Sequence, residues 1–307
     1  MEDKKLITPE DAAERLGMSP KTIRDWCRSG QINGIKVGRA GLWRIPEEEI
    51  EKVIESNTKA GMRKIAIAIS KGGVGKTTTA VNLSAGLAMQ GKKVLLIDTD
   101  TQGQVSTLLG LEPEKGLAEL LGKEISITEA ITKARENLFV LAGGDNLASM
   151  KIQITKELDQ PQFALANVLE EIEGQFDYVI IDTAPSWDIL NLSVLFYAHE
   201  VLVPISLEVL SVQGFAKFQE NLQNVSKYQQ NLELKYILPT FLDRRVKRST
   251  EILQQLKFTF PYQICDPIRY NSKLAEAPGS GQSIFEFDKR SAGARDYDKL
   301  VSRVLKS

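Results

Sequence analysis

The sequence predicts an α/β protein with a doubly wound, mainly parallel sheet, preceded by a small winged helix-turn-helix domain. Three patterns favour this fold. An apolar run, a glycine-rich turn and a helical pattern follow one another between residues 64 and 89. Two further apolar runs end at Asp98 and Asp182, as expected for buried parallel strands whose carboxyl ends share one ligand-binding edge. Near the N-terminus, a tight turn separates two short helical patterns.

The composition is that of a soluble protein with room for one large and one small domain, since the chain has 307 residues, 42% hydrophobic and 26% charged. The net charge of −1 means that any affinity for nucleic acid must come from local patches. Cys27 and Cys265 are far apart, which argues against a disulfide framework or a thiolate metal site. We expect a cytoplasmic protein, because no apolar run approaches the roughly 20 residues that cross a bilayer and none resembles a signal peptide.

The first helix is predicted over residues 10–16. Thr8 suits the N-cap, Asp11 completes a capping box, and Gly17 ends the helix. A second helix is predicted over residues 20–29, opened by a serine cap and a proline. Two short helices joined in this way form the helix-turn-helix pattern.

A wing is predicted after these helices, because residues 32–45 read as two short strands around a glycine-containing turn. A third helix over residues 46–56 would pack behind the wing. The polar stretch that follows has no periodicity and reads as a linker. We therefore expect a helix-turn-helix domain at residues 1–56, a linker at residues 57–63 and the large domain at residues 64–307.

Basic residues dominate the helix-turn-helix region, where Asp25 is the only acid between residues 15 and 44. The second helix is predicted to enter a major groove, and the wing tip to reach phosphate or a minor groove. The DNA-binding candidates here are Lys21, Thr22, Arg24, Arg28 and Arg39. The alternative is a helical bundle whose solvated charged face binds protein. The stretch resembles the excisionase/MerR-like winged helix-turn-helix domains, which implies specific DNA binding as a dimer.

The segment of residues 70–79, SKGGVGKTTT, has the pattern of a phosphate-binding loop between a strand and a helix. Its glycines permit a backbone that points N–H groups at phosphate, beside the positive end of the helix. Lys76 is expected to reach the β- and γ-phosphates, and the Thr77 hydroxyl to bind Mg²⁺. The ATP-binding candidates in this loop are Lys71, Gly72, Gly73, Val74, Gly75, Lys76, Thr77 and Thr78. The alternative is a glycine-rich turn that binds nothing.

The form K-G-G-x-G-K-T-T resembles the deviant Walker A motif of the ParA/MinD/Soj ATPases, which are P-loop NTPases. Ser70 stands where the strict pattern has glycine, and Lys71 is a second lysine at the front of the loop. The resemblance implies that Lys71 reaches across a dimer to the partner's nucleotide. Together with Lys76 it would then neutralise charge during hydrolysis.

Acidic segments follow two of the predicted strands. Residues 98–104 resemble the family's D-x-D-P-Q-G-N motif, which implies that Asp100 orients the attacking water and that Asp98 supports the Mg²⁺ shell. The alternative is that these acids only cap a helix. Asp182 ends the run DYVIID, which is the Walker B pattern of an Mg²⁺-holding carboxylate. The next residues, 183–186, resemble a switch that senses the γ-phosphate.

The remaining elements of the large domain are predicted from periodicity alone and do not indicate a substrate. Helices are expected at residues 104–109, 116–121, 128–135, 147–157, 163–172 and 291–305. One further helix is expected to begin near residue 212, and another to end near residue 257. Strands are expected at residues 138–141, 200–204 and 234–239.

Two C-terminal stretches resemble family segments that contribute adenine contacts and basic residues for nonspecific DNA. One is the D-x-R stretch that begins at Asp243, and the other is LAEAP at residues 274–278. By this resemblance Pro267 is an ATP-binding candidate, although it lies two places further upstream than in the family form. The DNA-binding candidates are Arg245, Lys247, Arg248, Arg269 and Lys273, the last standing where arginine is usual. The alternative is a solvated cationic surface.

These patterns favour a ParA-type ATPase for plasmid or chromosome partition, with ATP and Mg²⁺ as cofactors. The resemblance implies an ATP-dependent homodimer, nonspecific DNA binding on the nucleoid, and a ParB-like adaptor that stimulates slow hydrolysis. The N-terminal domain would bind an operator or centromere. One alternative is a transcription regulator that only senses ATP. Another is a membrane-cycling ATPase of the Min type, which residues 301–307 are too short and weakly apolar to support.

Overall fold

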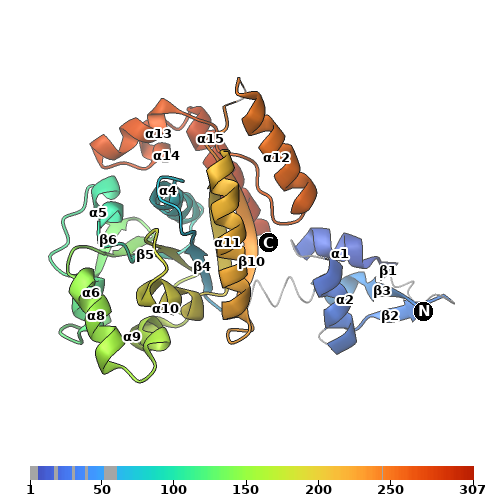
Figure 1. Ribbon diagram of the computed structural model, residues 1–307, viewed down its shortest axis with the longest axis horizontal. Coiled ribbons are helices and arrows are strands. Elements are labelled where there is room, and N and C mark those ends of the chain that lie inside the picture. The colour runs from blue at the N-terminus through green and yellow to red at the C-terminus, as the bar shows by residue number, and fades with distance from the viewer. Residues whose placement is uncertain (1–5, 17–19, 30–31, 39–40, 52–60, 244) are drawn as a thin grey trace.

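The computed structural model describes residues 6–16, 20–29, 32–38, 41–51, 61–243 and 245–307 (Figure 1). It contains two sheets, one of three strands near the N-terminus and one of seven strands in the large domain. The expected domain boundaries at residues 56 and 63 stay predictions, because residues 52–60 lie outside the described part.

The N-terminal unit has the predicted helix-turn-helix and wing. Its elements are β1 (Leu6–Ile7), α1 (Pro9–Leu16), α2 (Pro20–Ser29), β2 (Ile35–Val37) and β3 (Leu42–Pro46), followed by helical residues 47–51. The capping box of α1 is confirmed, since Thr8 and Asp11 each accept the other's backbone N–H at 3.1 Å. The short strand β1, which pairs antiparallel with β3, was not predicted.

The large sheet has the strand order β10-β9-β4-β8-β5-β7-β6. Its strands are β4 (Arg63–Ile67), β5 (Val94–Asp98), β6 (Ile131–Arg135), β7 (Leu138–Leu141), β8 (Tyr178–Asp182), β9 (Glu200–Ser206) and β10 (Glu233–Thr240). All neighbours pair parallel except β6 and β7, which are antiparallel. The mainly parallel sheet is therefore confirmed. The strand that follows the P-loop helix, β5, lies two places from β4, because β8 lies between them.

Helices cover both faces of this sheet (Figure 1). On one face lie α4 (Lys76–Met89), α5 (Gln104–Leu109), α14 (Ile284–Asp288) and α15 (Ala292–Lys306). The other face packs against α6 (Leu117–Leu121), α7 (Ile127–Ala130), α8 (Leu147–Glu157), α9 (Ala164–Leu169), α10 (Ile189–Tyr197), α11 (Val209–Ser226) and α12 (Lys247–Thr259). The short helix α13 is Ser272–Glu276. Single-turn 3₁₀ helices are Pro161–Phe163, Glu170–Ile172 and Ala277–Ser280.

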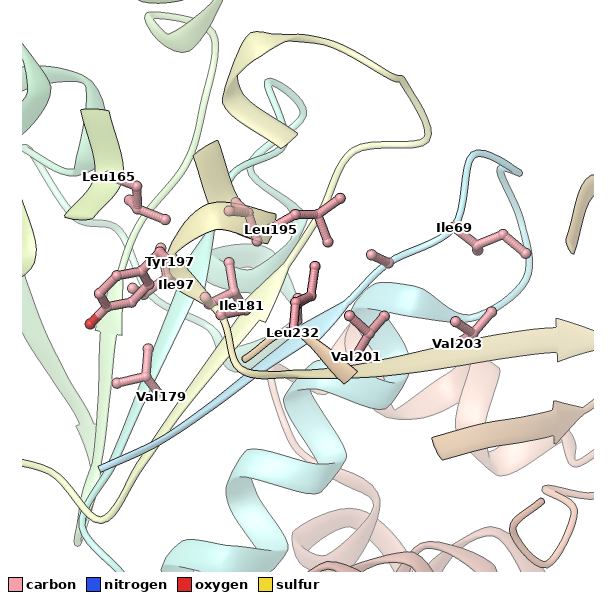
Figure 2. Packing of buried hydrophobic residues seen from close by; sticks show 14 of the residues in the cluster. Ile69, Ile97, Leu165, Val179, Ile181, Leu195, Tyr197, Val201, Val203 and Leu232 are labelled. Carbon is pink, nitrogen blue, oxygen red and sulfur yellow. The ribbon is translucent and has the colours of Figure 1, made fainter. Parts of the chain in front are cut away.

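Figure 2 shows the apolar layer on the second face. Side chains of β8 and β9, such as Val179, Ile181 and Val201, meet Leu165 of α9 and Leu195 of α10. The strands are apolar along their whole length because both faces of the sheet are buried. Burial of these continuous runs holds the carboxyl ends of the strands in one rigid row, where the polar residues of the site lie.

One predicted helix is wrong. The pattern over residues 128–135 splits into α7, which ends at Ala130, and the edge strand β6 (Ile131–Arg135). Pairing with β7 decides this conformation, because the antiparallel ladder supplies the backbone hydrogen bonds that a helix would have made. The β-branched pair Ile131 and Thr132 suits a strand. Other element ends differ from prediction by only a few residues.

Candidate functional site

The glycine-rich loop joins β4 to α4. Gly73 and Gly75 have φ angles of +70° and +87°, in the left-handed region that favours glycine. Gly75 immediately precedes α4, so the first N–H groups of the helix face the loop. Thr240 at the end of β10 donates its hydroxyl to the Val74 carbonyl at 3.0 Å, which ties the loop to the sheet. The loop therefore has a backbone suited to phosphate.

Lys76 is the first residue of α4, and its side chain turns back into the loop. Its Nζ donates to the Lys71 carbonyl at 2.8 Å. Burial lowers the pKa of Lys76, while the Asp182 and Asp100 carboxylates act in the opposite direction. The ammonium thus lies between a loop built for phosphate and the acidic edge of the sheet.

Lys71 contacts its own chain. Its Nζ donates to the Ser211 hydroxyl at 2.7 Å and lies 3.7 Å from a Glu208 carboxylate oxygen. Both partners lie at the β9–α11 junction, and Ser211 is buried there. The contact fixes where the side chain rests in this structure, and its expected reach toward a partner subunit's nucleotide stays a prediction.

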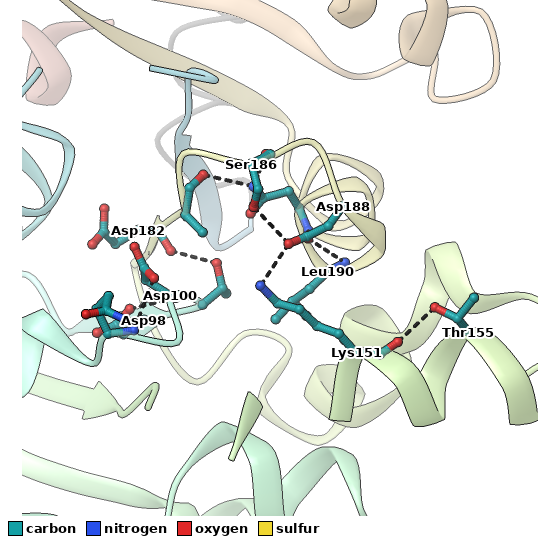
Figure 3. A network of polar contacts seen from close by, with 12 residues as sticks. Asp98, Asp100, Lys151, Thr155, Asp182, Ser186, Asp188 and Leu190 are labelled. Carbon is teal, nitrogen blue, oxygen red and sulfur yellow. Dashed lines mark hydrogen bonds and ion pairs between the residues drawn. The ribbon is translucent and has the colours of Figure 1, made fainter. Parts of the chain in front are cut away.

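Asp98 and Asp182 meet at the carboxyl ends of the neighbouring strands β5 and β8, where they are register partners and fully buried (Figure 3). Neither carboxylate oxygen of Asp182 has a hydrogen-bond partner. Burial and the Asp98 carboxylate raise the pKa of Asp182, against the pull of Thr77 and Lys76. A buried carboxylate that makes no well-formed hydrogen bond, with only the Thr77 side chain beside it as a donor, is an unfavourable arrangement on its own, and a cation would compensate it.

The residues at this edge fit Mg²⁺. A Thr77 hydroxyl and an Asp182 carboxylate are oxygen donors, and Mg²⁺ characteristically takes few protein ligands beside substrate phosphates and water. Within the described ranges there is no cluster of three or more His, Cys, Asp or Glu residues suited to a metal. The donor set therefore suits a metal bound together with a nucleotide better than a stand-alone metal site.

Asp98 and Asp100 differ in their surroundings. The Asp98 carboxylate accepts backbone N–H groups from Asp100 at 2.9 Å and from Val105 at 3.1 Å, so it shapes the loop between β5 and α5. Burial raises the pKa of Asp98 to about 6. Asp100 is partly exposed and accepts the Gln102 N–H at 3.1 Å. Of the two, Asp100 is the carboxylate with access to a water molecule.

The loop after β8 lies against the front of the P-loop. Thr183 donates its hydroxyl to the Ile67 carbonyl at 2.9 Å, and an ideal Cβ on Gly72 would lie 3.8 Å from Pro185. The loop ends at Asp188, which caps α10 (Figure 3). Sequence reasoning missed Asp188, although an aspartate just before an apolar helical run is a recognisable N-cap signal.

Pro267 lies in a cleft of about 520 Å³ beside the end of β10. The cleft is lined by Leu242 and by residues of α12, of α15 and of the chain between α12 and α13. The Arg269 side chain in this cleft donates through Nε and Nη2 to the buried Asp296 carboxylate. The backbone N–H of Arg269 also donates to this carboxylate, at 3.0 Å. Arg269 therefore organises the cleft wall, which accounts for its position without DNA.

The other C-terminal DNA candidates lie on the surface, and Arg245, Lys247 and Lys273 lie beside acids. Arg245 forms a two-pronged ion pair with Asp243, with the shorter contact at 2.7 Å, and the Arg245 hydrogen bonds hold the pKa of Asp243 at about 2. Lys273 pairs with Glu276 at 2.6 Å. Lys247 lies 3.7 Å from Glu251, and Arg248 is exposed on the first turn of α12. Exposed pairs of this kind contribute little stability, so freeing these cations from their acids would cost little.

Of the N-terminal DNA candidates, Lys21, Thr22, Arg24 and Arg28 belong to α2, and two of these four have acidic partners. Arg24 pairs with Glu10 of α1, and Arg28 pairs with Asp25 at 2.6 Å. Lys21 is exposed near the start of α2. The side chain of Thr22 and all of Arg39 lie outside the described part of the chain, so their expected DNA contacts stay predictions.

Comparisons with known proteins agree with this geometry. A family model described as "AAA domain" matches residues 62–236, and one described as "Helix-turn-helix domain" matches residues 6–58. The chain is thus an ATPase-fold protein with an N-terminal helix-turn-helix region. It is 35% identical to the chromosome-partitioning ATPase Soj of Treponema pallidum, over 76% of this chain and 94% of that protein. It is 36% identical to Soj of Thermus thermophilus, over 80% of this chain and 97% of that one.

A solved structure supports the same fold with a bound nucleotide. The cobyrinic acid a,c-diamide synthase of Mycobacterium smegmatis, with bound ADP and magnesium, is 30% identical, with a TM-score of 0.69 over 80% of this chain and 94% of that one. The chain belongs to the ParA/Soj family of partition ATPases. None of the helices in the described segments is long and apolar enough to cross a membrane.

Proposed function

We propose that this protein is an ATP hydrolase that partitions a plasmid or chromosome, and that its ATP-bound homodimer holds DNA. The observation that carries the proposal is the buried Asp182 carboxylate, whose oxygens make no well-formed hydrogen bond and which lies beside Thr77 and within electrostatic reach of Lys76. A P-loop lysine at a helix start and a buried carboxylate at the end of a neighbouring strand suit Mg²⁺ and a nucleoside triphosphate. The cytoplasm and the nucleoid are the expected location.

Hydrolysis at this site requires positioning and charge neutralisation more than proton transfer. Thr77 and Asp182 would hold Mg²⁺, with Asp98 behind them. The metal, when bound, would polarise the γ-phosphate. Lys76 would neutralise charge from within the same chain, and Asp100 would orient the attacking water. Because no strong general base lies at this edge among the described residues, we expect slow intrinsic turnover.

The proposed dimer depends on Lys71. To reach a partner subunit's nucleotide, its side chain must leave Ser211 and Glu208, which hold it through one hydrogen bond and one long ion pair. The Glu208 carboxylate is largely exposed, so release costs little. A ParB-like adaptor would stimulate hydrolysis and so end the dimer's hold on DNA. The N-terminal region would bind a specific operator or centromere.

The Lys76→Ala variant tests the proposal, because it removes the cation that is expected to meet the β- and γ-phosphates from within the same chain. We expect fluorescent ATP analogues to bind at least roughly tenfold more weakly, since a charge-assisted contact is worth more than 1.4 kcal/mol. Equilibrium titration with Mg²⁺ measures this. Unchanged affinity in a folded variant would remove the ATPase proposal.

Lys71→Ala is the companion variant for the dimer. It should bind nucleotide like the unmodified protein and yet remain monomeric in light scattering with ATP. Dimers of Lys71→Ala with ATP would contradict the role of Lys71 while leaving the ATPase proposal intact.

A transcription regulator that senses ATP is a second candidate, favoured by the helix-turn-helix match. In that case ATP would change the footprint of the intact chain on a specific site, and no ATP-dependent nonspecific binding would be seen. DNA footprinting with and without ATP separates the two functions.

A further inference from the structure

The loop that follows Asp182 is tied to other elements by the Thr183 hydroxyl on the Ile67 carbonyl and by the Trp187 ring against Phe218 of α11. Its remaining contacts are local. Asn191 donates to the carbonyls of Ala184 and Ser186, the first at 2.9 Å. Asp188 accepts the N–H groups of Leu190 and Asn191 at 3.1 and 3.0 Å. These local contacts keep residues 184–191 compact, and none of them reaches an element outside the loop and helix α10.

One contact to Asp188 comes from a distant element. Lys151 of α8 donates its Nζ to Asp188 Oδ2 at 2.8 Å, and Ser186 donates its hydroxyl to the same oxygen at 2.8 Å (Figure 3). The Lys151 and Asp188 side chains are 16% and 27% exposed, so water screens the pair only in part. Of the four donors to Asp188, Lys151 alone lies outside the loop and helix α10.

Helix α8 also connects this pair to the acidic edge. Four residues before α8, Gly143 lies against the site, where an ideal Cβ would be 2.7 Å from the Asp100 carbonyl and 2.9 Å from the Asp98 carbonyl. Midway along α8, Met150 and Ile154 form a small apolar cluster against which Ile189, the residue after Asp188, packs. The segment from Gly143 to Ile154 therefore connects the loop between β5 and α5 (the aspartate loop) with the loop after Asp182.

We propose that Lys151 is a positioning residue for hydrolysis: its ion pair with Asp188 holds the loop of residues 183–188 against Gly72 of the P-loop, in the geometry that the reaction needs. The proposal rests on the proposed ATPase function and adds a residue to it. Lys151 touches neither nucleotide nor metal in this scheme, and it acts through Asp188 and Pro185. It should therefore matter for the rate of the chemical step and not for capture of ATP.

The test compares Lys151→Met with Lys151→Arg in the full-length protein. Lys156→Met is the matched control, because Lys156 is an exposed lysine on the same helix. We expect Lys151→Met to lower kcat on the order of tenfold, because misplacing a reacting group by a fraction of an ångström has costs of this size. KM for ATP should stay within about twofold, Lys151→Arg should recover most of kcat, and Lys156→Met should match the unmodified protein.

Fluorescence quenching of Trp187 reports on the position of the loop, and it would not change if Lys151 only stabilised the fold. It lies in the loop beside Asp188, is 42% exposed, and the other two tryptophans, Trp26 and Trp43, lie in the N-terminal unit. Release of the loop should make ATP-bound Lys151→Met more quenchable by acrylamide than the ATP-bound unmodified protein. Lys156→Met should show no such increase.

Asp188→Asn is the second variant, in case Lys151→Met fails to fold. It keeps an oxygen to cap α10 and loses the charge, so it should show the same fall in kcat, and the double variant should fall no further. An unchanged kcat and unchanged quenching in folded Lys151→Met or Asp188→Asn, with normal ATP binding, would overturn the positioning role alone. Absence of ATP hydrolysis by the unmodified protein would overturn the proposed function and this inference together.

Discussion

At the scale of single residues, the acidic edge depends on a glycine. Gly143 does not have a positive φ angle, so glycine is needed at this position because there is no room for a Cβ. A Cβ at this position would meet the Asp98 and Asp100 carbonyls and would lie 3.0 Å from Asp98 Cγ. Because two of these three atoms belong to the backbone, the loop itself would have to move.

Gly143→Ala should therefore damage hydrolysis without removing any polar group. We expect at least roughly tenfold lower kcat, because Asp98 and Asp100 are displaced from the nucleotide. Single-turnover phosphate release measures this. Gly214→Ala is the control, since nothing lies within 4 Å of a Cβ there and α11 should gain about 0.5–1 kcal/mol of stability. Normal turnover by Gly143→Ala would show that the aspartate loop tolerates the shift.

At the scale of elements, Arg63 joins the start of β4 to three other elements. Its guanidinium donates to Glu200 of β9 at 2.6 and 2.8 Å, to Tyr236 of β10 at 2.7 Å and to the Val304 carbonyl of α15 at 2.6 Å. Burial opposes ionisation of Glu200, yet the Arg63 hydrogen bonds and charge hold the pKa of Glu200 below its usual range. The two side chains are 16% and 12% exposed, so the pair is largely buried and its two charges depend on each other.

Arg63→Met should destabilise the large domain strongly. The expected loss is about 3–5 kcal/mol, because Glu200 is left buried and charged without a partner. Arg63→Met/Glu200→Gln should lose less, since no unpaired charge remains. Urea unfolding followed by circular dichroism gives both values. Lys133→Met, which breaks an exposed ion pair with Glu136, should change little. A double variant less stable than Arg63→Met would contradict this explanation.

The elements also show where local patterns were sufficient. The helices predicted at residues 104–109 and 147–157 are α5 and α8 with the same limits, because periodicity and caps are properties of contiguous sequence. The strand β6 was mistaken for a helix because its conformation depends on β7 and not on its own propensity. Edge strands are short and half-exposed, so their periodicity is weak.

At the scale of the whole molecule, the proposed function uses two DNA-binding surfaces. One is the helix-turn-helix region with Lys21, Arg24 and Arg28. The other is the C-terminal group Arg245, Lys247, Arg248 and Lys273, which needs the ATP-bound dimer. Because the net charge is only −1, neither surface benefits from a strong overall field. The two surfaces should therefore be separable by experiment.

Deletion of residues 1–60 should abolish a sequence-specific footprint and preserve ATP-dependent binding to random DNA. That remaining binding should weaken steeply with salt, because it consists of phosphate contacts. Lys71→Ala in the full chain is the reciprocal control, expected to keep the footprint and to lose the ATP-dependent binding. Footprinting and fluorescence anisotropy measure the two activities. Loss of both activities in either variant would mean that the surfaces do not act independently.

The sequence alone determined the fold class, the phosphate loop and the aspartates at the strand ends. Each of these is written in contiguous residues whose chemistry is required locally: glycine where φ is positive, lysine and threonine at a helix start, and aspartate after a buried strand. Only the tertiary structure revealed the Lys151–Asp188 pair, the contact of Gly143 with the aspartate loop, and the Arg63–Glu200 pair. Their partners are 37 to 137 residues apart or meet through loops, and nothing in a local pattern specifies which distant side chains a folded sheet brings together.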